Sequence, residues 1–189
     1  MIRKLLGITL TLLALSIVLL VFEGCNRPLT LDGAILKWSR QLDLDPLLVK
    51  AIISHETGKG RWFSRNDWRR LHTQKWAVDA VRRYDLDPDD WKSWASIGPM
   101  QILLLTAKAE GYSGGAGDEK TQTGLYNVST NLKYGCLYLA DLRTTYDSTS
   151  HAVASYNAGK PRMLRGVYYN QKYVDAIKGE YYRLGGGHG

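Results

Sequence analysis

Along this chain, stretches whose apolar residues recur every three or four positions alternate with short breaks rich in Gly, Pro and Asp. That spacing is typical of amphipathic α-helices. The clearest helix begins at Asp45-Pro46, where an N-cap residue is followed by Pro at the first helical position. The helix is predicted to continue through Glu56 and to stop at Gly58.

The same reasoning predicts helices along most of the remaining chain. Thr30 is expected to cap a first helix with apolar residues at 31, 34, 35 and 38. Ser150 is expected to cap the segment before Gly159. Ser96 to Ile102 is predicted to open a helix with a tight Gly turn, and 113–124 to form a loop. Further helical spacing covers 76–84, 100–109, 132–142, 151–157 and 169–181. With no convincing period-2 strand and no internal repeat, the sequence predicts a mainly α protein.

The first 25 residues have the pattern of a membrane-targeting segment. Arg3 and Lys4 precede an uncharged run from Leu5 to Phe22, which is long enough to span a bilayer as a helix. Gly24-Cys25 resembles the end of a bacterial lipoprotein signal and makes Cys25 a lipidation candidate, although Glu23 is unusual there. A cleaved lipoprotein signal and an uncleaved anchor both remain open. Either one predicts an exported, membrane-anchored domain that faces the periplasm or cell wall.

Residues 26–184 suit one domain with one core, followed by a Gly-rich tail at 185–189 that is expected to be flexible. Five of the six tryptophans lie between residues 60 and 95, within a strongly basic block. The net charge of +7 favours an anionic partner but is equally compatible with a solvated surface. Cys136 is predicted to be a small buried hydrophobe, since free cysteines commonly pack in that way. Core packing is the default for tryptophan; stacking on sugars remains open for Trp62, Trp68, Trp91 and Trp94.

One carboxylate continues an apolar helix face. Val49, Ile52, Ile53 and Glu56 follow i, i+3, i+4 and i+7 spacing. If Glu56 faces the core, its desolvation would raise the pKa towards the value that a general acid needs near neutral pH. A solvated Glu in a frayed last turn fits the spacing as well, so other residues must decide.

Five short motifs occur together in a fixed order. They resemble the signatures of the soluble-lytic-transglycosylase-type (SLT) catalytic domain, a lysozyme-like family that cleaves peptidoglycan. Those signatures are Glu-Ser after an apolar helix, Gly-Leu-Met-Gln, Asn-Ile-x-x-Gly, Tyr-Asn-Ala-Gly and a final Tyr-Val. Thr replaces Ser and Pro replaces Leu in this chain. The matching segments are Glu56-Thr57, Gly98-Pro99-Met100-Gln101, Asn131 to Gly135, Ser155 to Gly159, and Tyr173-Val174.

The resemblance implies a lysozyme-like fold, with 60–95 as an insertion over or beside the cleft. It implies a lytic transglycosylase in which Glu56 alone acts as acid and then base, leaving 1,6-anhydro-muramoyl ends. Tyr156 would hydrogen-bond Glu56, and Met100 would pack against the sugar. Tyr173 would line the cleft or support it from behind. The remaining substrate-binding residues implied are Ser96, Gln101 and Asn157.

Other readings remain open at this level. A goose-type lysozyme would share the fold and use an acid to position water, with Asp67, Asp79 and Asp85 as candidates. A non-catalytic wall-binding module is the rival from another class. Nucleic-acid binding explains the basic block but none of the motifs. The four histidines are scattered without metal-ligand spacing, and we expect neither metal nor cofactor. The expected partners are peptidoglycan strands and a membrane, and the expected state is a monomer.

Overall fold

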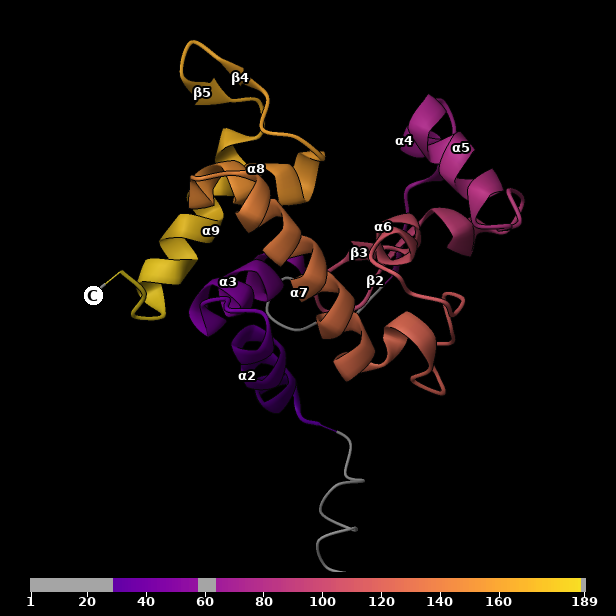
Figure 1. The fold of residues 1–189 in the computed structure, drawn as a ribbon, viewed down its shortest axis with the longest axis horizontal. Helices are drawn as coiled ribbons and strands as arrows, with labels where there is room; N and C mark the ends of the chain where they lie inside the picture. Colours follow the sequence, from indigo (N-terminus) through magenta and orange to yellow (C-terminus); the bar gives the residue numbers. More distant parts are fainter. Residues whose placement is uncertain (1–28, 58–63, 188–189) are drawn as a thin grey trace, which may run out of the picture.

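The computed structural model describes residues 29–57 and 64–187 (Figure 1). The predicted targeting segment with Cys25, the predicted helix stop at Gly58 and the end of the tail lie outside these residues. Within the described ranges, no helix is both long and apolar enough to cross a membrane.

Five helices pack together and form the larger part of the structure (Figure 1). Their starts follow the capping signals of the sequence. The Thr30 hydroxyl accepts a bond from the Gly33 amide at 3.1 Å, and Asp45 Oδ1 accepts one from the Leu47 amide at 2.8 Å. These caps confirm the two N-terminal helix predictions. The five are α2 (Leu31–Gln41), α3 (Pro46–Glu56), α7 (Val128–Thr145), α8 (Thr149–Ala158) and α9 (Gln171–Arg183).

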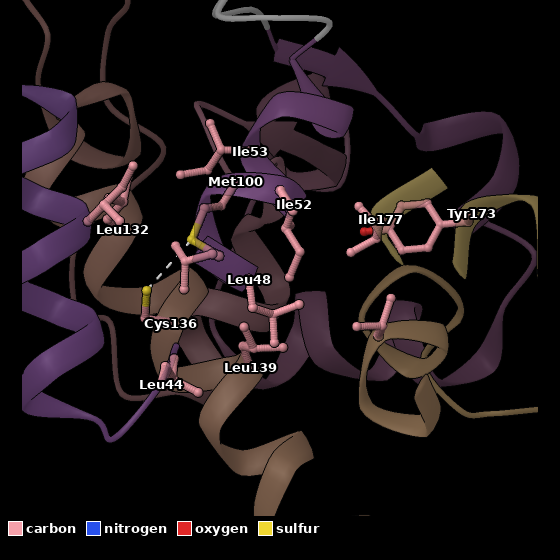
Figure 2. Packing of buried hydrophobic residues seen from close by; sticks show 14 of the residues in the cluster. Leu44, Leu48, Ile52, Ile53, Met100, Leu132, Cys136, Leu139, Tyr173 and Ile177 are labelled. Carbon is pink, nitrogen blue, oxygen red and sulfur yellow. Dashed lines mark hydrogen bonds between the residues drawn. The ribbon is translucent and has the colours of Figure 1, made fainter. Parts of the chain in front are cut away.

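The core of this helical part is one cluster that contains apolar residues of α3, α7 and α9. Figure 2 shows Ile52 of α3 among side chains of this core, including Leu139 of α7 and Ile177 of α9. Cys136 is fully buried there as a free thiol, as predicted, and burial raises its pKa to about 12. A stiff helical framework therefore carries the end of α3, where Glu56 lies.

A second part of the fold contains short strands that the sequence analysis did not predict. β2 (Ala95–Ile97) pairs antiparallel with β1 (Ser64–Asn66) on one side and β3 (Ile102–Leu103) on the other. The prediction of a helix from Ser96 onwards is therefore wrong; α6 begins only at Leu104 (Leu104–Ala109). Strands of two or three residues are too short to show a period of two.

The turn between β2 and β3 is clamped by Asn131 of α7. Its side chain accepts a bond from the Met100 amide at 2.9 Å and donates to the Ile97 and Leu125 carbonyls at 2.7 and 2.9 Å. Gly98 has φ of 71°, and a Cβ there would lie 2.4 Å from the Asn131 side chain. Two motifs that are far apart in sequence thus form one structural unit.

Several short helices pack together beside this small sheet. α4 (Trp68–Leu71), α5 (Lys75–Arg83) and the 3₁₀ turn η1 (Trp91–Trp94) share a small core with Leu105 of α6. The α5 helix matches its prediction. Residues 113–123 form the predicted loop, and η2 (Gly124–Tyr126) joins it to α7.

The chain after α8 differs in detail from its prediction. Gly159 ends α8 in the left-handed region at φ 78°, as expected, but the helix begins one residue before Ser150, and the N-cap is Ser148. A hairpin of β4 (Met163–Leu164) and β5 (Val167–Tyr168) follows, which was not predicted. It projects beyond α8 and leads into α9, which starts after Tyr169 (Figure 1).

Candidate active site

A cleft of about 590 Å³ separates the two parts of the structure. On one side, α3 and α8 line it together with the segment after α8; on the other, β2, β3, α4, α5 and α6 do so. In Figure 1 the α4–α5 pair and the α8 region stand apart on opposite sides of the small sheet. Glu56 is the only acidic residue among the described residues that line the cleft.

Glu56 is the last residue of α3 and is half-buried. The residue that follows helps to fix this helix end. The Thr57 amide and hydroxyl both donate to the Ile53 carbonyl, at 3.0 and 2.7 Å. Because the last turn is pinned in this way, the carboxylate is directed into the cleft rather than held on a frayed end.

The phenol of Tyr173 holds the Glu56 carboxylate. Its hydroxyl donates to Glu56 Oε1 at 2.8 Å, across 117 residues of sequence. Tyr173 lies on α9, is only 8% exposed, and is absent from the cleft lining (Figure 2). Burial, the charge of Glu56 and the bond to it raise the Tyr173 pKa well above the ordinary range. The phenol therefore remains a donor at any pH at which an enzyme would work.

Tyr156 has a different partner from the one predicted. It lines the cleft, but its hydroxyl donates to the Met100 carbonyl at 3.0 Å. The expectation that Tyr156 donates to Glu56 is corrected by this geometry, since Tyr173 makes that bond. Burial first, and the charge of Glu56 second, raise the Tyr156 pKa well above its ordinary value. Tyr156 thus links α8 to the β2–β3 turn close to the acid.

Met100 does not face the cleft. Its side chain is 0% exposed and lies in the helical core, with Sδ 3.9 Å from Cys136 Sγ (Figure 2). A Cβ at Gly135 would lie 2.5 Å from that sulfur, so Gly135 makes room for it. The expectation that Met100 packs against sugar is therefore wrong. Met100 instead stabilises the β2–β3 turn, because its backbone amide and carbonyl bind Asn131 and Tyr156.

The other predicted substrate-binding residues do line the cleft. Gln101 is at positive φ of 45°, and its amide nitrogen donates to the Gly98 carbonyl at 2.9 Å. Asn157 is exposed at the end of α8, and its amide oxygen accepts from Asn170 at 3.2 Å. Both amides are thus held at the edge of the cleft by neighbouring groups.

Ser96 connects the cleft to a buried acid. Its hydroxyl donates to Asp67 Oδ2 at 2.7 Å, and Arg70 Nε lies 3.5 Å from Asp67 Oδ1. Of the three acids considered for positioning water, only Asp67 reaches a residue that lines the cleft. Asp79 instead pairs with Lys75 at 2.6 Å, and Asp85 lies in an exposed turn.

Among the described residues, the tryptophan that lines the cleft is not one of the four for which the sequence left sugar stacking open. Trp62 and the Trp68 side chain lie outside what the structure describes. Trp94 is buried and donates to the Pro88 carbonyl at 2.9 Å, so it cannot stack on a sugar. Trp91 is exposed but is not part of the cleft lining. Trp76, which the sequence analysis did not single out as a sugar-stacking residue, does line the cleft.

Apart from Glu56, the charged residues among the described cleft lining are all cationic. Arg70, Lys160 and Arg162 line the cleft and are exposed. Within residues 29–57 and 64–187, no group of three or more His, Cys, Asp or Glu side chains is placed to hold a metal ion. The arrangement can therefore offer one proton donor, several neutral hydrogen-bonding groups and positive charge.

The sequence was also compared with known proteins. The model of the family described as "Transglycosylase SLT domain" matches residues 33–177. This chain belongs to that family. The matched region contains Glu56, Tyr173 and the cleft between them, as well as the Asn131 clamp. No curated protein and no solved structure gives a significant match.

Membership of the SLT family implies peptidoglycan as the substrate and confirms the resemblance found in the motifs. The structure adds the partners of those motifs. Sequence reasoning also missed the bond to Glu56 from Tyr173, for which it predicted a cleft-wall or supporting position without a partner. The spacing of Tyr173 on α9, four residues before Ile177 in the core, places it on the buried face and was the available signal.

Proposed function

We propose that this protein is a lytic transglycosylase that cleaves the bond between N-acetylmuramic acid and N-acetylglucosamine. The observation that carries the proposal is the position of Glu56, the only acid among the described cleft-lining residues, with Tyr173 bonded to it at 2.8 Å. Many glycosidases use two carboxylates that flank the scissile bond. A single acid in the cleft favours a route in which the substrate supplies the nucleophile.

In the proposed reaction, protonated Glu56 donates its proton to the glycosidic oxygen as the bond from that oxygen to muramoyl C1 breaks. The acetamido group of the substrate stabilises the cation at C1. Glu56, now a carboxylate, accepts the proton of the muramoyl 6-hydroxyl while O6 bonds to C1. Glu56 ends protonated, no water is consumed, and the product has a 1,6-anhydro ring.

The residues around Glu56 have separate roles in this proposal. The Tyr173 phenol binds Glu56 Oε1 and so holds the carboxylate in one orientation beside the substrate. Tyr156 fixes the β2–β3 turn beside the acid and is a positioning residue. Ser96, Gln101 and Asn157 offer uncharged hydrogen-bonding groups suited to acetamido and hydroxyl substituents.

Digestion of purified sacculi by the full-length chain tests the proposal, with the products read by mass spectrometry. We expect anhydro-muramoyl ends that disappear in Glu56→Gln. Glu110→Gln is the matched control, because Glu110 is a half-buried glutamate outside the cleft lining. No release from several wall types by the native chain would leave a non-catalytic wall-binding module as the better reading.

Hydrolysis of the goose-lysozyme type is the second candidate, and the bond from Ser96 to Asp67 is what favours it. That bond places a buried carboxylate one residue away from the cleft, where it could orient water through the serine hydroxyl. Reducing ends that disappear in Asp67→Asn would support hydrolysis. Anhydro ends that persist in Asp67→Asn would exclude it.

We further propose that residues 1–25 export the domain and hold it at a membrane. The basic residues before the apolar run and the cysteine that follows it support this. Intact-mass analysis of the protein from a bacterial membrane fraction separates the two routes. A chain that begins at a lipidated Cys25, and is lost in Cys25→Ser, indicates a lipoprotein; a chain that retains its N-terminus indicates an anchor. Recovery of the unprocessed chain from the soluble fraction would contradict both.

A further inference from the structure

Trp76 occupies an unusual position for a tryptophan. It lies in the first turn of α5, and 53% of its surface is exposed. The neighbouring Ala77 and Val81 bury the other face of the helix against Leu71 and Trp94. The small core of this region is therefore complete without the indole, and packing does not account for a large aromatic side chain at this site.

A single exposed aromatic residue is ordinary on a protein surface and needs no explanation by itself. The position of Trp76 is what distinguishes it. Four tryptophans have side chains that the structure describes, and only Trp76 among them lines the 590 Å³ cleft that also contains Glu56. Trp91 is similarly exposed, at 40%, but does not line it.

The polar residues near Trp76 on this wall complete a binding surface. Gln74 immediately precedes α5, and Arg70 lies on α4; both line the cleft. Asp67 holds Arg70 at 3.5 Å and is bonded to Ser96 of β2, so the α4 end of this wall is tied to the sheet. A flat apolar ring flanked by an amide and a guanidinium suits a sugar, whose ring has an apolar C–H face and a rim of hydroxyl and acetamido groups.

We propose that the α4–α5 wall is an additional saccharide subsite, in which Trp76 stacks on a pyranose ring of the glycan strand. Trp76 lines the cleft from α5, whereas Glu56 lines it from α3. In Figure 1 the α4–α5 pair stands apart from α8. The subsite gives the basic, Trp-rich block a role in holding the strand. This inference rests on the proposed function for the identity of the ligand, but not on turnover.

Binding can be measured without cleavage in the full-length Glu56→Gln chain. We would titrate it with peptide-free peptidoglycan glycan hexasaccharides and follow the heat of binding. We expect Trp76→Ala to weaken binding about tenfold, because the stacking surface is removed. Trp76→Phe keeps an aromatic face and is expected to lose only about threefold. Trp91→Ala is the matched control and should bind within about twofold of the parent.

Several results would overturn the subsite. They are tight binding by Trp76→Ala, equal losses in Trp76→Ala and Trp76→Phe, and no binding of the glycan by the Glu56→Gln parent. Urea unfolding of each variant checks that the fold is intact. Because the substituted side chains are exposed, we expect the free energy of unfolding to stay the same. The sacculus digest reads the proposed function separately. Normal cleavage together with binding that does not depend on Trp76 would contradict only the subsite. Binding that depends on Trp76, without any cleavage, would contradict only the transglycosylase.

Discussion

The two walls of the cleft are built in different ways. The helical wall presents Glu56 from α3 and Tyr156 from α8, and Tyr173 of α9 supports Glu56 from behind this wall; the three helices share one core. The opposite wall, from β2, β3 and α4–α6, consists of strands of two or three residues and short helices around two smaller clusters of buried residues. The first wall supplies the acid and its hydrogen-bond donor, whereas the second supplies Ser96, Gln101 and Trp76.

In the function that we propose, this difference separates the chemical step from substrate recognition. A proton donor must be held in a narrow range of positions, and long helices locked in one core provide that. Recognition of a long polymer needs a shaped surface, which short elements form readily. The two walls meet at the β2–β3 turn. The side chains of Asn131 and Tyr156, which come from the helical part, hold the backbone of this turn. Breaking those contacts should test whether the walls depend on each other.

Removal of the Asn131 clamp should have the largest effect. Asn131→Ala leaves the Met100 amide and the Ile97 and Leu125 carbonyls without this partner in a buried place. We expect the free energy of unfolding to fall by about 3 kcal/mol, measured by urea denaturation. Asn127→Ala is the control, because Asn127 caps the same helix at a less buried site and should cost about 1 kcal/mol. Equal losses in the two variants would show that the clamp does not couple the walls.

Loss of the Tyr173 phenol should come next. Tyr173→Phe removes a bond to a carboxylate, worth roughly 1.5–3 kcal/mol, so we expect kcat to fall about 10- to 100-fold. The limb of the pH–rate profile that reports on Glu56 should move to higher pH, because the carboxylate loses a donor. Tyr181→Phe is the control. Tyr181 lies on the same helix as Tyr173 but away from the cleft lining, and its 2.6 Å bond to the Asp45 carboxylate is the one that this change breaks, so activity should be retained.

Tyr156→Phe should have a smaller effect than Tyr173→Phe. Its hydroxyl binds a neutral carbonyl, so we expect a threefold to tenfold loss of kcat with little movement of the pH profile. Steady-state rates of the two variants on the same sacculi make the comparison. A larger loss in Tyr156→Phe, together with a shifted profile, would indicate that Tyr156 tunes the acid directly.

Alkaline pH should lower the free energy of unfolding through two phenols of the helical part. The folded pKa values of Tyr156 and Tyr173 lie well above the ordinary value of 10.0. Below about pH 10 the two phenols are neutral in both the folded and the unfolded state, so their full contribution to the free energy of unfolding is present. That contribution falls as the pH rises from there towards the folded-state pKa values. Urea denaturation at neutral pH and at about pH 11 should show a smaller alkaline loss in each Phe variant than in the parent. An unchanged loss would mean that these phenols ionise normally.

The sequence predicted the helical wall better than its opposite, for physical reasons. Asp45-Pro46 and a run of apolar residues specify α3 locally, so its bounds and the position of Glu56 could be predicted. Pairing of Arg65 with Ser96 depends on residues far apart, and strands this short leave no periodic pattern. The Tyr173–Glu56 bond joins residues 117 positions apart, so no local rule could pair them. The prediction that Met100 faces the sugar was wrong because its motif specifies a backbone turn and does not determine which side chains line the cleft.

The central claim is that Glu56 alone cleaves the strand without consuming water. The most direct measurement is a digest of sacculi by the full-length chain in heavy-oxygen water, with mass spectrometry of the new muramoyl ends. We expect anhydro ends that contain no heavy oxygen, a rate that falls about a thousandfold in Glu56→Gln, and no change in Glu110→Gln. Reducing ends that carry heavy oxygen, or cleavage by Glu56→Gln at the native rate, would contradict it.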